Sequence, residues 1–433
     1  MVWNESRECM SRDEIEKIQS EELVGVVSRV YHNVPFYRAK MQAIGLEPGD
    51  IHGLADLEKL PMTTKQDLRD TYPYGMFSAP LDDIVRIHAS SGTTGKQTVV
   101  GYTRKDVDIW SECMARSLSS GGAGRDSIVQ VSYGYGLFTG GLGAHYGAER
   151  IGASVIPTSS GNTQRQIQII RDFGSTHICC TPSYALYIGD TMREMGVHKS
   201  EIRLKAGFFG AEPWTENMRR EIEERLGLHA LDIYGLSEVM GPSVSCECLE
   251  QSGMHVWEDH FIPEIINPET LETMAPGANG EILFTTITKE GMPLIRYRTR
   301  DVSSLNYERC PCGRTHVRMT RITGRTDDML IIRGVNVFPS QIESVLLEFG
   351  DAAPHYQIIV DRSDNLDEIE VQVEMTPQMF SDEIKNIERT ERKIMSALHS
   401  VLGLAAKVRL VEPKTIARSE GKAKRVIDNR VLK

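Results

Sequence analysis

A short loop at residues 90–96 combines the residue types that bind polyphosphates. Its members are Ser90, Ser91, Gly92, Thr93, Thr94, Gly95 and Lys96. The glycines let the backbone approach a phosphate closely, the hydroxyl and N–H groups donate hydrogen bonds, and the lysine neutralises charge. It is not a Walker A loop, because two residues instead of four separate its glycines and Gln97 follows the lysine in place of Ser or Thr. The sequence therefore predicts a nucleotide site and disfavours a kinase or P-loop NTPase.

Three cysteines and one histidine have the residue types of a structural zinc site. Cys310 and Cys312 form a close pair, and Cys248 and His255 precede them in the chain. Three thiolates and one imidazole complete a tetrahedral zinc shell and leave no open position for catalysis. The Cys-x-Cys spacing is shorter than in most zinc knuckles, and Cys246 could replace Cys248. Reduced cysteines without a metal are the alternative interpretation.

The elements that must position these residues follow from the apolar pattern. Residues 1–80 have a helical pattern, and from residue 84 short apolar runs alternate with helical stretches. This alternation predicts a largely parallel sheet covered by helices. The strand candidates are 84–87, 128–131, 153–156, 177–180, 206–209 and 231–234, with helices at 164–173 and 217–226. Ligands bind beyond the carboxyl ends of such strands, which is where the 90–96 loop and the run 234–238 fall.

The pattern changes after residue 325. Strand candidates at 329–332, 355–360, 369–373 and 408–411 surround a long amphipathic helix at 380–402, and this set predicts a compact α+β domain of about 100 residues. We therefore expect an α/β protein with two domains. The large N-terminal domain, 1–326, has helix-covered, mostly parallel sheets, and the small C-terminal domain, 327–433, follows a hinge at Asp327.

Composition limits the function classes. The chain has 433 residues, 40% of them hydrophobic and 25% charged, which is ordinary for a globular protein. A net charge of -11 without a basic run argues against a general nucleic-acid binder. The first residues lack the apolar core of a signal peptide, and no run is long enough to span a membrane. We expect a cytoplasmic protein, in which the cysteines do not form a disulfide framework.

Several segments together resemble the adenylate-forming superfamily, in its acyl-CoA synthetase branch. These are 90–96, 209–213, 234–238, 297–301 and 324–328, in the order of that family. Segments 134–141, 255–261 and 418–423 resemble the phenylacetate-CoA ligases more narrowly. The resemblance implies that a carboxylic acid attacks ATP to give acyl-AMP and pyrophosphate, and that CoA then displaces AMP to form a thioester. It also implies that the C-terminal domain is mobile and rotates between these half-reactions.

The resemblance also implies the roles of individual residues. Those matched to nucleotide binding are Ser91, Gly92, Thr93, Thr94, Gly95, Lys96, Gly210, Ala211, Glu212, Pro213, Asp232, Tyr234, Gly235, Asp301 and Arg325. Tyr234 would stack on adenine and Asp301 would bind the ribose hydroxyls. The alternatives are a core tyrosine for Tyr234 and an ion pair with the neighbouring arginines for Asp301.

Three residues are matched to catalysis. Lys422 would neutralise charge between the acid and the α-phosphate, with Lys424 as its near competitor. Glu238 would hold Mg²⁺ through one carboxylate, and Ser237 would contact a phosphate or the acyl carboxylate. Ser237 is not an acyl-enzyme nucleophile, because Gly-Leu-Ser-Glu lacks the second glycine of a nucleophile elbow.

The remaining matches concern the acid and CoA. Tyr133, Phe138, Gly210 and Pro242 resemble the aryl pocket, beside which Gly140, Gly141 and Gly143 would leave room; Arg333 and Gly334 resemble the CoA-facing loop. The pocket does not decide between phenylacetate, hydroxyphenylacetate and indoleacetate, because small differences in size discriminate weakly.

We expect ATP, CoA, Mg²⁺ and zinc as cofactors or substrates, and the resemblance favours a homodimer. The alternatives are an enzyme that loads an aryl acid onto a carrier-protein thiol and a non-catalytic nucleotide-sensing module. The presence of Lys422 disfavours the second.

Overall fold

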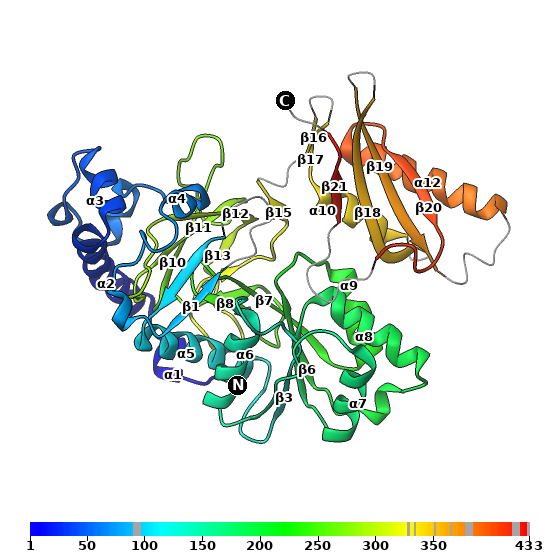
Figure 1. Cartoon of the computed structure of the whole chain (residues 1–433), viewed down its shortest axis with the longest axis horizontal. Helices are drawn as coiled ribbons and strands as arrows, with labels where there is room; N and C mark the ends of the chain where they lie inside the picture. Colours follow the sequence, from blue (N-terminus) through cyan, green and yellow to red (C-terminus); the bar gives the residue numbers. More distant parts are fainter. Residues whose placement is uncertain are drawn as a thin grey trace. The chain divides into compact units, whose positions relative to one another are not determined.

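The computed structural model describes residues 1–89, 97–326, 330–332, 335–349, 352–363, 366–376, 384–417 and 425–430. They form two compact units, each of which can be followed in Figure 1. The first unit comprises Met1–Ala211 and Ile222–Ile322, and the second comprises Glu212–Glu221 and Thr323–Lys433. The domain boundary between residues 326 and 327 stays a prediction.

The N-terminal segment is helical, as its pattern predicts. It contains α1 (Glu5–Glu8), α2 (Arg12–Asn33), α3 (Pro35–Gln42) and α4 (Lys65–Asp70), with short 3-10 turns at Pro48–Asp50, Leu54–Lys59 and Leu81–Asp83. Helix α2 begins at Ser11, whose side chain and that of Glu14 form a capping box, and such a box satisfies two backbone N–H groups that the helix leaves free. Leu23 and Val27 lie fully buried on its inner face.

One nine-stranded sheet forms the centre of the first unit, in the order β13-β14-β9-β8-β7-β6-β5-β3-β4. Its parallel half contains β3 (Ile128–Val131), β4 (Ser154–Ile156), β5 (His177–Cys180), β6 (Ala206–Gly210) and β7 (His229–Leu236). Helix α5 (Arg104–Ser120) precedes these strands, and α6 (Gly140–Arg150), α7 (Thr163–Phe173) and α8 (Pro182–Glu194) lie between them in the chain, with a 3-10 turn at Lys199–Glu201. Helix α9 (Glu216–Leu226) lies between β6 and β7 in the chain, and its residues are divided between the two units. Helices α5 and α6 pack on each other and on β8, whereas α8 contacts α7 and β6 (Figure 1). The predicted strand–helix alternation is confirmed here.

The other half of the sheet is antiparallel, so the sheets are mixed rather than mostly parallel. It contains β8 (Gly241–Glu247), β9 (Met254–Val256), β14 (Arg318–Met319) and β13 (Leu305–Asn306). A second antiparallel group contains β10 (Phe261–Ile266), β11 (Gly280–Thr286) and β12 (Tyr297–Ser303), and β1 (Arg86–Ala89) pairs with β2 (Val99–Tyr102). For β7, β8 and β9 the physical reason is connection length, because short connections between strands that are neighbours in the sheet favour antiparallel pairing. Strand β1 begins two residues after the start of the predicted run at 84.

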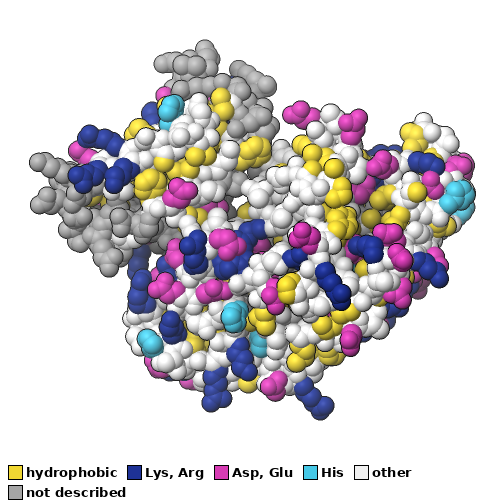
Figure 2. All heavy atoms as spheres, turned by 180° about the vertical axis from the view of Figure 1, so that it is seen from behind, with side chains coloured by type: hydrophobic (Ala, Val, Ile, Leu, Met, Phe, Trp, Pro, Cys, Tyr) yellow, Lys and Arg dark blue, Asp and Glu magenta, His cyan; other side chains and the backbone are white. Residues whose placement is uncertain are grey.

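A continuous apolar core joins the helices and sheets of the first unit. Among its fully buried members are Trp110, Phe208, Leu231, Trp257 and Phe284. None of the helices in the described part of the chain is both long and apolar enough to cross a membrane. On the face drawn in Figure 2, acidic and basic side chains are interspersed, as on the surface of an ordinary globular protein.

The second unit has its own sheet and core. Its elements are β15 (Gly324–Arg325), β16 (Leu330–Ile332), β17 (Val335–Val337), α10 (Pro339–Glu348), β18 (Ala352–Ser363), β19 (Leu366–Met375), α12 (Ile384–Leu402), β20 (Lys407–Val411) and β21 (Val426–Asp428). The sheet order is β20-β19-β18-β21, with β18 and β19 antiparallel and the two outer strands parallel to their neighbours. Ile358, Val371 and Leu398 lie fully buried in the core between this sheet and the helices. The predicted α+β character is confirmed, and the predicted helix at 380–402 is described from Ile384 onward.

Candidate active site

The carboxyl ends of β6 and β7 bring several predicted residues together. The two strands are parallel neighbours, and Gly210 pairs with Ile233 in their register. A Cβ on Gly210 would lie 2.0 Å from the Ile233 carbonyl oxygen, and a Cβ on Gly235 would lie 1.9 Å from the Gly241 oxygen. Both glycines are therefore required by the close approach of two backbones, whatever ligand lies beyond them.

Tyr234 and Asp301 form the most direct contact between predicted nucleotide-binding residues. The Tyr234 hydroxyl donates a hydrogen bond to Asp301 Oδ2 at 2.7 Å, and its ring stacks on that of Phe284 at a centroid distance of 6.0 Å. Tyr234 is only partly buried, so this aromatic contact leaves part of the ring accessible.

The arginines of the 297–301 run, and Arg296 before it, have carboxylate partners of their own. Arg296 pairs with Glu264 at 2.8 Å, and Arg298 and Arg300 pair with Glu281 at 2.7 and 3.5 Å. Charge neutralisation of these arginines therefore does not depend on Asp301.

Asp232 lies on β7, two residues before Tyr234. Its carboxylate pairs with Arg321 at 3.3 Å, and its backbone N–H donates to Glu247 Oε2 at 2.8 Å. Arg321 is not predicted from the sequence, because no motif joins two residues so far apart in the chain.

A single turn, residues 237–240, carries the predicted catalytic residues Ser237 and Glu238. The hydroxyl oxygens of Ser237 and Thr139 are 2.9 Å apart. Glu238 is buried, and its Oε1 accepts no hydrogen bond from the described residues. The ammonium of Lys65 on α4 lies 3.5 Å from this oxygen. Thr139 and Lys65 are not predicted from the sequence, because they come from distant segments without a motif of their own.

The residues of the predicted aryl pocket lie in different environments. Tyr133 is buried and its hydroxyl donates to the Phe208 carbonyl at 3.4 Å, whereas Phe138 is 38% exposed. A Cβ on Gly140 would lie 2.5 Å from the Phe138 ring, and one on Gly143 would lie 2.7 Å from Pro242. Neighbouring side chains thus occupy the space where a Cβ would stand on Gly140 and Gly143, and the room that these glycines would leave for an aryl ring stays a prediction.

Several predicted residues belong to the second unit or lie outside the described residues. Ala211 ends the first unit with φ 70°, and Glu212, Pro213 and Arg325 belong to the second unit. The residues outside the described part are Ser91, Gly92, Thr93, Thr94, Gly95, Lys96, Asp327, Arg333, Gly334 and Lys422. Directly after the Lys422 segment, Arg425 pairs with Glu343 at 3.4 Å and lies 4.4 Å from the centroid of the Tyr356 ring.

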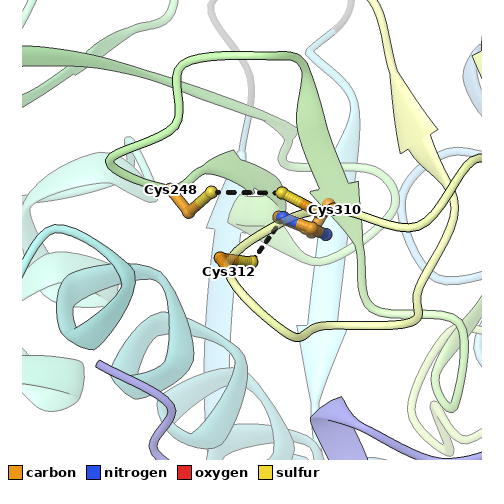
Figure 3. A group of neighbouring side chains, drawn as sticks. Cys248, Cys310 and Cys312 are labelled. Carbon is orange, nitrogen blue, oxygen red and sulfur yellow. Dashed lines mark hydrogen bonds between the residues drawn. The ribbon is translucent and has the colours of Figure 1, made fainter.

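A separate group of four side chains forms a candidate metal centre. The ligand atoms of Cys248, His255, Cys310 and Cys312 all lie within 4.8 Å of one another. Figure 3 shows the three cysteines gathered from two segments of the chain. The sulfurs of Cys248 and Cys310 are 3.7 Å apart, and Cys312 Sγ is 3.5 Å from His255 Nε2. Burial lowers the pKa of His255, which favours the neutral imidazole that metals bind.

Cys246 does not join this group. It lies within β8, fully buried, and its sulfur is 3.9 Å from the hydroxyl of Ser120 on α5. Cys248 lies just after the end of β8, where the chain leaves the strand and can turn its side chain toward His255. The structure therefore selects Cys248 from the two candidates.

The N-terminal segment supports the loop that carries Cys310 and Cys312. Arg314 donates to Glu8 Oε2 at 2.6 Å and to Cys312 Sγ at 3.6 Å, and Thr315 N–H donates to the Glu8 carbonyl. A buried cation beside Cys312 favours its thiolate electrostatically. Neither Glu8 nor Arg314 was found from the sequence.

Comparison with known proteins covers both parts of the chain. The AMP-binding enzyme family matches residues 23–288, and the AMP-binding enzyme C-terminal domain matches residues 334–430. Among solved structures, 2-hydroxyisobutyryl-CoA ligase in the postadenylation state is similar at a TM-score of 0.92 and 29% identity, over 98% of this chain and 92% of that chain. The fold is thus that of the adenylate-forming enzymes.

Two curated relatives are similar over nearly their whole length. A phenylacetate-coenzyme A ligase of Escherichia coli (strain K12) is 52% identical over 426 residues, 98% of this chain and 97% of that protein. A phenylacetate-coenzyme A ligase of Thermus thermophilus is 47% identical over 444 residues, 99% of this chain and 100% of that protein. The resemblance inferred from the motifs is confirmed, and the chain belongs to the AMP-binding enzymes, in the group of the phenylacetate-coenzyme A ligases.

Proposed function

We propose that this protein is an AMP-forming ligase that activates phenylacetate with ATP and transfers the phenylacetyl group to CoA, releasing AMP and pyrophosphate. The observation that carries the proposal is the 52% identity with the phenylacetate-coenzyme A ligase of Escherichia coli over 98% of this chain. Transfer to a carrier-protein thiol and a non-catalytic role are not favoured, because the full-length relatives are CoA ligases.

The nucleotide site uses residues from two sheets of the first unit. Tyr234 packs against adenine, and Asp301 binds the ribose hydroxyls, with the hydrogen bond of 2.7 Å between them holding the carboxylate in place. Asp232, Gly210 and Gly235 shape the adjoining strand ends. The 90–96 loop binds the β- and γ-phosphates, a role that rests on its motif alone.

The 237–240 turn serves the phosphates and the acid. Glu238 fits as a Mg²⁺ ligand, because its buried Oε1 accepts no hydrogen bond from the described residues and oxygen is the ligand atom that Mg²⁺ prefers. The Lys65 ammonium, 3.5 Å from this oxygen, neutralises the carboxylate without a hydrogen bond. Bound there, the ion would neutralise charge on the triphosphate. Ser237, held by Thr139, orients the acyl carboxylate or a phosphate. Lys422 neutralises charge between the acid and the α-phosphate during adenylation.

Phenylacetate is the proposed acid, with hydroxyphenylacetate and indoleacetate as competitors. Tyr133, Phe138, Gly210 and Pro242 line the aryl site, and aromatic faces favour a flat ring between them. Arg333 and Gly334 contact CoA, and Asp327 is the hinge between the half-reactions. A cytoplasmic location and a homodimer stay predictions.

The four-residue group fits a structural zinc ion. Zinc with Zn–S bonds of about 2.3 Å holds two sulfurs about 3.7 Å apart in a tetrahedral shell. Cys248 and Cys310 have their sulfurs at 3.7 Å. Three cysteines and one histidine complete the shell, so the ion would support folding of the 310–316 loop and not the reaction.

One assay tests the proposed activity. Pyrophosphate release is followed with ATP, Mg²⁺ and a panel of arylacetic acids, with and without CoA, and products are identified by mass. Phenylacetyl-CoA and AMP from phenylacetate support the proposal. Pyrophosphate without consumption of CoA assigns another acyl acceptor, and no pyrophosphate with any acid contradicts the proposal.

A further inference from the structure

Lys289 is a fully buried lysine that no motif singles out. It lies in the connection between β11 and β12, and 1% of its surface is exposed. Its ammonium donates to the carbonyl oxygens of Glu238 and Val239 at 3.1 and 2.9 Å. It also lies 4.8 Å from the centroid of the Tyr102 ring. The lysine thus contacts the backbone of the 237–240 turn directly.

Tyr102 binds the other two carbonyl groups of the same turn. Its hydroxyl lies 3.2 Å from the Ser237 oxygen and 3.0 Å from the Met240 oxygen. Burial raises the pKa of Tyr102 well above its usual value, so the hydroxyl remains protonated. Two side chains therefore serve all four carbonyl groups of the turn that carries Ser237 and Glu238.

The shape of the turn explains why a cation fits there. The N–H groups of Val239 and Met240 both donate to the Leu236 oxygen, at 3.1 and 3.2 Å, so the segment is a single helical turn. The carbonyl end of such a turn carries partial negative charge and has oxygens without partners inside the turn. An ammonium at this end is held by hydrogen bonds and by electrostatic attraction.

The segment that carries Lys289 is itself firmly supported. Asp106, near the start of α5, accepts hydrogen bonds from the backbone N–H groups of Glu290 and Gly291 at 2.7 and 2.8 Å. A Cβ on Gly291 would lie 2.6 Å from the Gly101 oxygen, so the two backbones approach as closely as glycine allows. The backbone next to Lys289 is therefore held in place, and with it the position of the ammonium.

A buried ammonium is energetically unfavourable in a protein core. Removing it from water is unfavourable even after the protein relaxes, and an apolar side chain of similar length would not carry this desolvation penalty. Burial lowers the pKa of Lys289 to about 8, although Asp106 and Glu238 act in the opposite direction. The main contacts of the Lys289 ammonium are the backbone carbonyl groups of Glu238 and Val239, in the turn of the proposed site. This position indicates a functional role for the buried charge.

We propose that Lys289 is a positioning residue for adenylation: it holds the 237–240 turn so that the Ser237 hydroxyl and the Glu238 carboxylate face the nucleotide and its Mg²⁺. The inference rests on the proposed function, in which Glu238 binds Mg²⁺. Lys289 itself touches neither substrate nor ion in this assignment. It acts through the backbone, so its loss misplaces the carboxylate without removing it.

The test separates the two half-reactions. In Lys289→Met, the Mg²⁺ concentration for half-maximal pyrophosphate release rises about 10- to 100-fold, as expected when the support of a metal ligand is lost. Formation of phenylacetyl-CoA from supplied phenylacetyl-AMP changes by less than about threefold, because that step contains no β- and γ-phosphates. Lys289→Gln keeps N–H donors for the two carbonyl groups and gives an intermediate effect.

Matched variants exclude a general loss of stability. Arg116→Met removes another buried cation, whose carboxylate partner is Asp259 at 2.8 Å. It is expected to lower the melting temperature and leave the Mg²⁺ dependence of pyrophosphate release unchanged. If Lys289→Met does not fold, Tyr102→Phe removes the two hydrogen bonds to Ser237 and Met240 and raises the same Mg²⁺ concentration to a smaller extent.

The remaining outcomes distinguish this inference from the proposed function. If Glu238→Gln raises the Mg²⁺ requirement and Lys289→Met does not, the positioning role is wrong and the proposed function stands. An equal loss in both half-reactions of Lys289→Met also overturns the positioning role. If wild-type protein releases no pyrophosphate, the proposed function is wrong. If Glu238→Gln leaves the Mg²⁺ requirement unchanged, the assignment of Glu238 as a Mg²⁺ ligand is wrong.

Discussion

The Tyr234 hydroxyl donates a hydrogen bond to Asp301 Oδ2 at 2.7 Å. Tyr234 lies on β7 of the nine-stranded sheet, and Asp301 lies on β12 of the neighbouring antiparallel group. In the proposed nucleotide site, this bond would fix the surface for the base and the acceptor for the ribose relative to each other before a nucleotide binds. Such preorganisation lowers the entropic cost of binding.

We expect Asp301→Asn to weaken nucleotide binding. Hydrogen bonds to a charged acceptor contribute about 1.5–3 kcal/mol, so KM for ATP should rise about 10- to 100-fold. Discrimination between ATP and 2′-deoxy-ATP should fall, because the Asp301 carboxylate is the proposed acceptor for the ribose hydroxyls. Tyr234→Phe keeps both the ring and the carboxylate and should have a smaller effect. Unchanged discrimination in Asp301→Asn would remove the ribose role.

Lys422→Ala should separate the half-reactions. The charge at the α-phosphate changes most while the acid attacks, so pyrophosphate release should fall at least about 100-fold. Thioester formation from supplied phenylacetyl-AMP should stay within about threefold. Lys424→Ala is the matched control and should retain both activities. Equal loss in both half-reactions would contradict the assignment of Lys422.

Purified protein should contain about one zinc per chain. Cys312→Ser should lower the zinc content and the melting temperature, whereas Cys246→Ser should retain the metal because Cys246 contacts Ser120 instead. A chelator should lower the melting temperature of the wild-type protein more than it lowers that of the Cys312→Ser variant. A zinc content below about a tenth per chain in wild-type protein would rule out the site at once.

The stability of the protein should fall on acidification between about pH 6.5 and pH 4. Burial lowers the pKa of His177 from 6.5 to about 4, and that of His260 also to about 4. The unfolded chain therefore binds more protons than the folded one in this window, so the free energy of unfolding decreases as pH falls.

For His177 alone, the free energy of unfolding is expected to decrease by about 2–3 kcal/mol from pH 7 to pH 4.5. Its Nε2 is buried and makes no hydrogen bond with the described residues, so protonation there is unfavourable. Denaturant unfolding of His177→Gln should show lower stability at pH 7 and a weaker dependence on pH. An unaltered pH dependence would show that His177 does not titrate in this way.

Two glycine substitutions should have opposite effects on stability. Gly210→Ala would place a Cβ 2.0 Å from the Ile233 oxygen, and we expect a loss of several kcal/mol because backbone must move. Gly25 lies in α2 with no atom within 4 Å of its added Cβ. Gly25→Ala should therefore raise the free energy of unfolding by about 0.5–1 kcal/mol. Melting curves of both variants test the pair.

The sequence by itself determined the elements whose formation depends on neighbouring residues. The apolar runs at 128–131 and 177–180 are β3 and β5 in full, and the strand–helix alternation identified the parallel half of the sheet. The order of the motifs identified the family. These properties depend on local periodicity and on residues that stand close together in the chain.

The tertiary structure decided the contacts between distant residues. In the antiparallel half of the central sheet, β8 and β9 return through short connections and β14 comes from a distant segment to pair with β9. The apolar pattern of these strands is not distinct from that of buried parallel strands. Cys248 rather than Cys246 joins the metal group because β8 ends at Glu247. Lys289 meets the 237–240 turn across some fifty residues. The spacing of residues in the sequence does not predict such contacts, because strand pairing and burial determine which side chains face one another.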